Sequence, residues 1–215
     1  MAVTDDVELL NAWKSGDKRA GAVLFERHYR SVLRFFHNKC GEQARDLIQR
    51  TFLRCLEARD RINEGSNFRA YLFGVARNVL LEHFRSVRRQ GDLFDVMKTT
   101  AAEISPQPTP GTMLAKKREV GLLMRALRRI PIELQITLEL YYWEHMQGRE
   151  IAAVFGLPEG TVRTRLRRAR QLLVREIEVL AATSTEFQST VSGLECWADK
   201  LRDALARDGL PAPRR

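Results

Sequence analysis

The sequence GLPEGTVRTRLRRAR, residues 156–170, places five arginines in fifteen positions with a single acid, Glu159. Gly156 can end the preceding helical segment, 150–155, in a left-handed conformation, and Pro158 suits the first turn of a second helix. Residues spaced by three and four predict one buried face for that helix: Val162, Leu166, Ala169, Leu173 and Ile177. The arginines occupy another face. A helix, a tight glycine turn and a basic helix together indicate a helix-turn-helix.

The basic helix carries residue types that contact DNA. In a helix-turn-helix the second helix enters the major groove with its N-terminal residues at base edges. This geometry nominates for base contact Glu159, Thr161, Arg163 and Thr164. We assign phosphate contacts to Arg165, Arg167, Arg168 and Arg170. An arginine run by itself is usually a solvated surface, but the preceding helix and glycine favour DNA binding, and the lack of Phe and Trp on the apolar side disfavours a membrane-lying helix.

Composition also favours a polyanionic partner. The 215 residues include 36 Lys and Arg against 27 Asp and Glu, a net charge of +9. No apolar run approaches the roughly 18 residues that span a bilayer. The first ten residues, MAVTDDVELL, carry acids at Asp5 and Asp6, where a signal peptide needs basic residues. We therefore expect a cytoplasmic protein without membrane insertion.

The cysteines and histidines indicate neither a metal nor a cofactor. Cys40, Cys55 and Cys196 are odd in number and far apart, which predicts reduced thiols. His37 and Cys40, with His28 nearby, supply too few ligands for structural zinc. We expect no enzyme, because no histidine has a Ser or Cys partner in the sequence pattern and the acids are scattered.

A linker divides the chain at residues 93–115. Three prolines and a glycine disfavour helix there: Pro106, Pro108, Pro110 and Gly111. Residues 1–92 carry 17 basic and 12 acidic residues, and 116–182 carry 13 and 8, so each module has a net charge of +5. The 23-residue linker reaches about 75 Å when extended, which lets both modules contact one duplex. Residues 183–215 form a C-terminal extension.

Apolar residues recur at helical spacing through most of the chain, and we predict no strand. Residues 5–38 predict two helices around a turn at 15–17, and 68–89 predict a long helix with aromatic and basic residues. In 42–59 one apolar stripe comprises Ala44, Leu47, Ile48, Phe52, Cys55 and Leu56. The predicted fold is all-α, with two small helical domains joined by a flexible linker and a helical extension.

Taken together, the two halves resemble the extracytoplasmic-function (ECF) sigma factors, subunits that direct bacterial RNA polymerase to promoters. Residues 127–173, LRRIPIELQITLELYYWEHMQGREIAAVFGLPEGTVRTRLRRARQLL, resemble the domain that recognises the −35 element. EQARDLIQRTFLRCLE at 42–57 resembles the polymerase-binding helix, and FRAYLFGVARNVLLEHFRSVRR at 68–89 resembles the segment that recognises the −10 element and opens the strands. The resemblance implies two partners, core RNA polymerase and promoter DNA.

Site residues follow from this resemblance. It implies that polymerase is bound by Asp46, Leu47, Gln49, Phe52 and Leu53. Leu47 and Phe52 also fit the apolar stripe, and Arg50, a further candidate for an exposed contact, stands where the family usually has an acid. The loop 63–67 resembles the family's base-capturing loop, with polar edges from Asn63, Ser66 and Asn67. The helix after this loop carries seven candidates for contact with the backbone and base edges of −10 DNA: Arg69, Tyr71, Arg77, Asn78, Arg85, Arg88 and Arg89.

The extension lies beyond the resemblance but has an apolar seam for another helix. Its residues are Phe187, Val191, Leu194, Ala198, Leu201 and Leu205. Two hypotheses fit the seam: a cap on the C-terminal domain, or intramolecular regulation of the DNA- or polymerase-binding surface. An anti-sigma factor is a further candidate partner.

The residues leave one alternative function open. A conventional helix-turn-helix repressor or activator would carry a ligand-binding or dimerising N-terminal domain and bind a palindrome without polymerase. A nucleic-acid-modifying enzyme would need catalytic carboxylates or a nucleophile, which the sequence pattern does not supply.

Overall fold

The computed structural model describes residues 5–62, 67–88, 95–104 and 118–192. Its first half is a bundle of four α-helices: α1 (Asp6–Lys14), α2 (Lys18–Cys40), α3 (Ala44–Glu57) and α4 (Phe68–Val87). Side-chain caps fix where two of them begin. The Asp17 carboxylate accepts from the N–H groups of Arg19 and Ala20, and the Asn67 side chain accepts from that of Ala70. The predicted turn at 15–17 separates α1 from α2.

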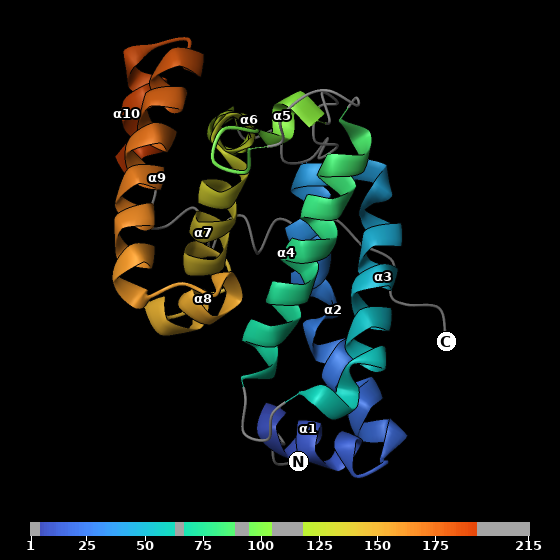
Figure 1. Cartoon of the computed structure of the whole chain (residues 1–215). Helices are drawn as coiled ribbons and strands as arrows, with labels where there is room; N and C mark the ends of the chain where they lie inside the picture. Colours follow the sequence, from blue (N-terminus) through green and yellow to red (C-terminus); the bar gives the residue numbers. More distant parts are fainter. Residues whose placement is uncertain (1–4, 63–66, 89–94, 105–117, 193–215) are drawn as a thin grey trace.

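The second half contains α6 (Arg118–Arg129), α7 (Ile132–Tyr142), α8 (Gly148–Phe155), α9 (Glu159–Leu180) and α10 (Ser184–Ser192). It lies beside the first half, with α7 and α8 next to α4 and with α9 and α10 on the outside (Figure 1). The described residues contain no strand, so the all-α prediction is confirmed.

Helix α7 lies at the centre of the molecule, and every residue from Ile132 to Leu140 is buried. Ile132, Ile136 and Leu140 pack into one hydrophobic core with α2 and α4 of the first half. Leu134 and Leu138 pack into a second core with α6 and α9. A helix that is buried all round belongs between two layers, and here it joins the two domains.

The linker begins with ordered structure. A single helical turn, α5 (Ala101–Ile104), lies within the segment that the prolines predicted to be non-helical. The N–H of Ile132 donates to the Thr99 carbonyl at 2.9 Å, and Ala101 is fully buried. These contacts fasten the start of the linker to the beginning of α7. Pro106, Pro108, Pro110 and Gly111 lie outside the described residues.

The first residues of the C-terminal extension pack on the helix-turn-helix domain. Phe187 and Val191 of α10 contact the core formed by α6, α7 and α9. This packing supports the capping hypothesis for Ser184–Ser192. The rest of the predicted seam, Leu194 to Leu205, lies outside the described residues.

Candidate nucleic-acid interface

The helix-turn-helix has the geometry that its sequence predicts. Helix α8 ends at Gly156, which adopts a left-handed conformation with φ of 65° and ψ of 38°. The Leu157 N–H donates to the Ala152 carbonyl at 3.0 Å and closes the turn. Pro158 occupies the N-cap of α9, one position before the first turn. The predicted inner face is confirmed, with Val162, Ala169, Leu173 and Ile177 buried and Leu166 half-buried.

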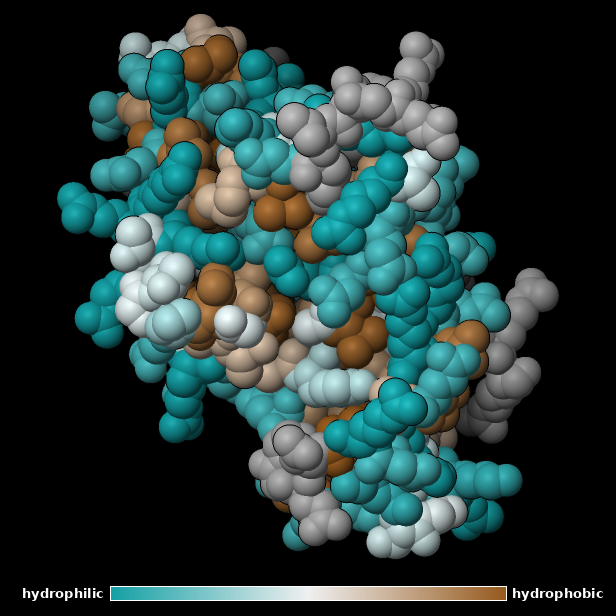
Figure 2. All heavy atoms as spheres, in the orientation of Figure 1, coloured by the Kyte–Doolittle hydropathy of each residue, from teal (hydrophilic) through white to brown (hydrophobic). Residues whose placement is uncertain are grey.

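Seven of the eight predicted DNA-contacting residues of α9 are exposed. They are Glu159, Thr161, Arg163, Thr164, Arg167, Arg168 and Arg170. The outer edge of the molecule along α9 is covered by hydrophilic side chains (Figure 2). None of the described residues covers this outward face, and its positive charge attracts a nucleic-acid backbone.

A groove of about 500 Å³ runs along one flank of α9, where Arg163, Arg167 and Arg170 line it together with Tyr141. The guanidinium of Arg170 lies 5.6 Å from the Tyr141 ring centroid and 5.3 Å from that of Tyr142. The two rings hold this arginine by cation–π contact. Sequence reasoning missed Tyr141, because its position at the end of α7 becomes a groove wall only when α9 packs beside it.

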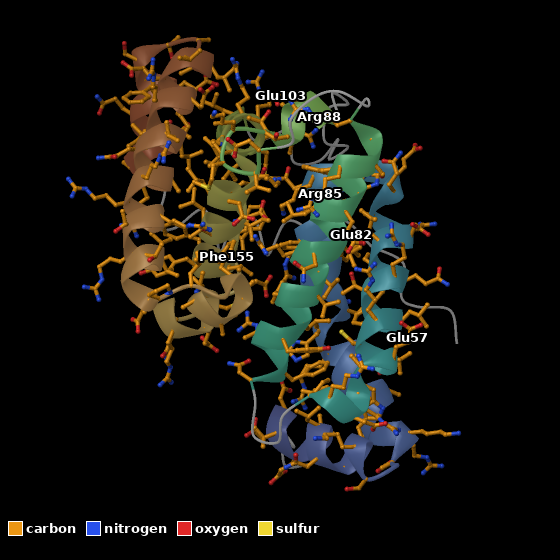
Figure 3. The ribbon with its side chains drawn as sticks, in the orientation of Figure 1. Glu57, Glu82, Arg85, Arg88, Glu103 and Phe155 are labelled. Carbon is orange, nitrogen blue, oxygen red and sulfur yellow. The ribbon has the colours of Figure 1, made fainter. Side chains whose placement is uncertain are left out.

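Arg165 differs from the other arginines of α9 because it points into the protein. Its Nη1 donates to Glu133 Oε2 of α7 at 2.8 Å, and its guanidinium lies 5.1 Å from the Phe155 ring. Phe155 is the last residue of α8 and lies on the side of the helix-turn-helix that faces α4 (Figure 3). Arg77 of α4 approaches the same ring at 5.2 Å. The sequence predicted that Arg165 contacts a DNA phosphate, but in the structure its guanidinium binds Glu133 of the protein instead.

Part of the predicted −10 surface, at the start and middle of α4, faces the second domain. Arg77 Nη2 lies 2.6 Å from Glu133 Oε1, and Arg69 Nη2 lies 3.0 Å from Glu144 Oε2. Asn67 donates from Nδ2 to Glu150 Oε1 of α8 at 2.6 Å. Three residues expected to contact DNA therefore contact acids of the second domain.

The other residues of this set lie elsewhere on α4. Arg85 and Asn78 are exposed, Tyr71 is half-buried, and Arg88 donates to the Thr99 hydroxyl at 2.7 Å. Figure 3 shows Arg85 and Arg88 toward the end of α4 that lies near α5. Three predicted residues lie outside the described residues: Asn63, Ser66 and Arg89.

The predicted polymerase surface is the outer side of α3. Asp46, Gln49 and Leu53 are exposed, whereas Leu47 is buried and Phe52 is half-buried beside aromatic rings of α2. Leu47 therefore acts through packing, as its place on the apolar stripe allowed.

Two further residues of α3 bear on this surface. Arg50 Nη2 lies 3.6 Å from Glu82 of α4, which Arg54 also binds through both carboxylate oxygens. Leu56 belongs to the apolar stripe of residues 42–59 but lies at its edge, because 49% of this residue is exposed. With Leu53, which is 51% exposed, it gives α3 an apolar surface flanked by polar residues.

Three acids of α7 and the turn after it are buried: Glu133, Glu139 and Glu144. Glu139 binds Lys39 of α2, which is also fully buried, and accepts from Gln135 at 2.8 Å. Burial raises the pKa of Glu139 and lowers that of Lys39, and the attraction between the two charges opposes both shifts. Burial alone would raise the pKa of Glu144, but the positive charges of Arg34 and Arg69 outweigh it and hold that pKa below its usual value.

The thiols of the first domain are shielded. Burial raises the pKa of both Cys40 and Cys55 to about 12. Within the part of the chain that the structure describes, no three His, Cys, Asp or Glu residues are grouped to hold a metal ion. No helix there is long and apolar enough to cross a membrane.

Comparison with known proteins assigns both domains. The family model for Sigma-70 region 2 matches residues 24–90, and that for Sigma-70 region 4 matches 121–173. The ECF RNA polymerase sigma factor SigL of Mycobacterium tuberculosis is 30% identical over 164 residues, covering 73% of this chain and 90% of that protein. The chain belongs to the ECF sigma factors. It is an RNA polymerase sigma factor, and its partners are core RNA polymerase and promoter DNA.

Two other similarities agree with this family. The ECF RNA polymerase sigma factor BldN of Streptomyces coelicolor is 27% identical over 172 residues, which is 79% of this chain and 64% of that protein. A solved structure of CnrH in complex with the cytosolic domain of CnrY has a TM-score of 0.61 at 22% identity, covering 82% of this chain and 99% of that chain. The latter supports the fold. Because the chain belongs to the sigma factors, the alternative function, a helix-turn-helix repressor or activator that binds DNA without polymerase, is excluded.

Proposed function

We propose that this ECF sigma factor directs polymerase to promoters with two separated elements, each recognised by one domain. Helix α9 reads the −35 element, with base contacts from Thr161, Arg163 and Thr164 near its start. Phosphates are held by Arg167, Arg168 and Arg170, all exposed. Arg165 positions α9 against Glu133 instead. The exposed N-terminal turns of α9 after a glycine turn are the observation that supports this function most directly.

The first domain supplies polymerase docking and strand opening. We place the docking surface on the exposed side of α3, with Asp46, Gln49 and Leu53 at its centre and Leu56 added by its exposure. Helix α4 and the loop before it contact the −10 element, as the family resemblance implies. In this function the sigma factor contributes no catalytic group. It acts in the cytoplasm together with polymerase, and its role is to recognise the promoter and to open the DNA strands there. That an anti-sigma factor binds this chain stays a prediction.

Transcription in vitro tests this function. The full chain is added to purified core polymerase on fragments of genomic DNA, and transcription start sites are mapped. We expect new start sites whose upstream sequences share two elements at constant spacing. A folded chain that does not bind core polymerase, or that binds a palindrome without it, would contradict the proposal.

A further inference from the structure

The end of α7 forms an aromatic wall beside α9, which lies next to it (Figure 1). Tyr141 and Tyr142 are the last two residues of α7, and their rings meet edge to face with centroids 5.0 Å apart. Tyr142 is half-buried and packs on the second core. Tyr141 is 38% exposed and lines the groove along α9. The ring that is packed on the core therefore supports the ring that is exposed.

Both rings contact the guanidinium of Arg170. Its central carbon lies 5.6 Å from the Tyr141 centroid and 5.3 Å from the Tyr142 centroid, and a cation within about 6 Å of a ring centroid is attracted by the ring. Arg170 is exposed, and no carboxylate of the described residues pairs with it. The two rings thus hold the guanidinium at the protein surface.

Arg165 shows the other way in which α9 holds an arginine. Its guanidinium donates to the buried carboxylate of Glu133, so its charge is matched inside the protein. A tyrosine ring carries no net charge, so Arg170 is held in place and still presents its full positive charge. A guanidinium oriented in advance binds a phosphate without first losing the freedom of a long side chain.

The place of Arg170 on α9 suits contact with the DNA backbone. It lies about 16 Å along the helix axis from Glu159, the first residue of α9. The major groove is roughly 8.5 Å deep, and a recognition helix places its N-terminal residues at the base edges there. Arg170 therefore lies outside the major groove, level with the sugar-phosphate backbone.

We propose that Tyr141 and Tyr142 are positioning residues of the −35 interface: their rings orient the Arg170 guanidinium toward a phosphate of the DNA strand that lies along the groove. The inference rests on the proposed reading of the −35 element by α9. It adds to that interface the end of α7, which is outside the helix-turn-helix. Removal of the Tyr141 ring changes no charge, yet it weakens promoter binding through its effect on Arg170.

A double-mutant cycle tests this coupling. Holoenzyme assembled from core polymerase and the full chain is titrated with duplex DNA that carries the −35 element found by start-site mapping. The wild-type chain is compared with Tyr141→Leu, with Arg170→Met and with the variant that has both changes. We expect Tyr141→Leu to weaken binding about threefold, which is the size of an exposed cation–π contact. In the Arg170→Met background it should have no further effect, because no guanidinium remains to be oriented.

Two controls separate this orientation from a general loss of structure. Tyr141→Phe keeps the ring and should bind like the wild-type chain. Arg168 is exposed on α9 and is not among the described residues that line the groove. In the Arg168→Met background, Tyr141→Leu should therefore still weaken binding about threefold. The salt dependence of binding should become shallower in Arg170→Met and stay unchanged in Tyr141→Leu, because only the first removes a phosphate contact.

The outcomes are distinct. The inference is overturned if Tyr141→Leu binds like the wild-type chain, or if it weakens binding equally with and without Arg170. If Tyr141→Leu fails to fold by circular dichroism, NMR relaxation of the arginine Nε–H groups in the free wild-type chain decides. Arg170 should then be more ordered than Arg168, and equal order of the two overturns the inference.

Failure of the proposed function gives a different result. Wild-type holoenzyme that binds this duplex no better than a duplex with a scrambled −35 element overturns the proposed function and this inference together. Wild-type holoenzyme that prefers the −35 duplex, with no coupling between Tyr141 and Arg170, overturns this inference alone.

Discussion

Gly156 shows how one backbone angle determines the entry into the recognition helix. Its φ of +65° is in the left-handed region, and an added Cβ would meet no atom within 4 Å. The requirement for glycine is therefore conformational and not steric. Residues 150–162 predicted this position from sequence, because a glycine between an apolar helix and a proline is typical of a helix end.

We predict opposite effects for two glycine substitutions in this region. Gly156→Ala should lower the free energy of unfolding by about 1 kcal/mol, because alanine is strained at positive φ. Gly160→Ala, in the first turn of α9 with open space around its Cβ, should raise it by about 0.5 kcal/mol. Urea denaturation of both variants measures the difference. A loss of stability in both would contradict this account.

At the scale of elements, α9 carries arginines of two kinds that the sequence does not separate. A helical wheel places Arg165 beside the inward residues, but only the packed structure shows that Glu133 of α7 and the Phe155 ring are there to receive it. The carboxylate comes from 32 positions earlier in the chain. Sequence reasoning therefore predicted the helix, its inner face and its turn, but not the partner of Arg165.

This difference predicts different consequences of removing each arginine. Arg167→Ala should weaken binding to −35 duplex DNA, because one phosphate contact is lost. The slope of the logarithm of the binding constant against the logarithm of salt concentration should become shallower by about one. Arg165→Ala should leave the salt dependence unchanged and lower the free energy of unfolding by about 2 kcal/mol, because a buried charged hydrogen bond is lost. DNA titrations at several salt concentrations, with urea denaturation, measure both effects. If DNA binding by Arg165→Ala depends less on salt than DNA binding by the wild-type chain, Arg165 contacts a phosphate and this account is wrong.

Helix α7 marks the limit of what periodicity can predict. Its apolar and polar residues alternate from Ile132 to Leu140, so apolar side chains occur on every side of the helix. Its four polar residues in this stretch are also buried: Glu133, Gln135, Thr137 and Glu139. Such a sequence indicates that the helix is buried, but it does not indicate which other helices cover it. The sequence predicted two separate modules, because nothing in either one alone reveals that the acids of α7 match cations on α2 and α4.

For the whole molecule, the contact at Glu144 predicts how stability depends on pH. Its pKa in the folded chain lies below the usual value, so its contribution is present at neutral pH and is lost as pH falls through the folded pKa. Glu144→Gln should cost about 2 kcal/mol of unfolding free energy at neutral pH, and the difference from wild type should shrink at about pH 4 and below. Urea denaturation across this range measures it. A difference that does not change with pH would exclude ionisation of Glu144 as its source.

The two-sided burial of α7 also has a consequence for either half of the chain when it is produced by itself. Without the first domain, Ile132, Ile136 and Leu140 would lose the apolar side chains of α2 and α4 that cover them. The isolated second half would then expose an apolar strip to water and would aggregate. We therefore expect soluble protein when the two halves are expressed together, and precipitation when the second half is expressed alone.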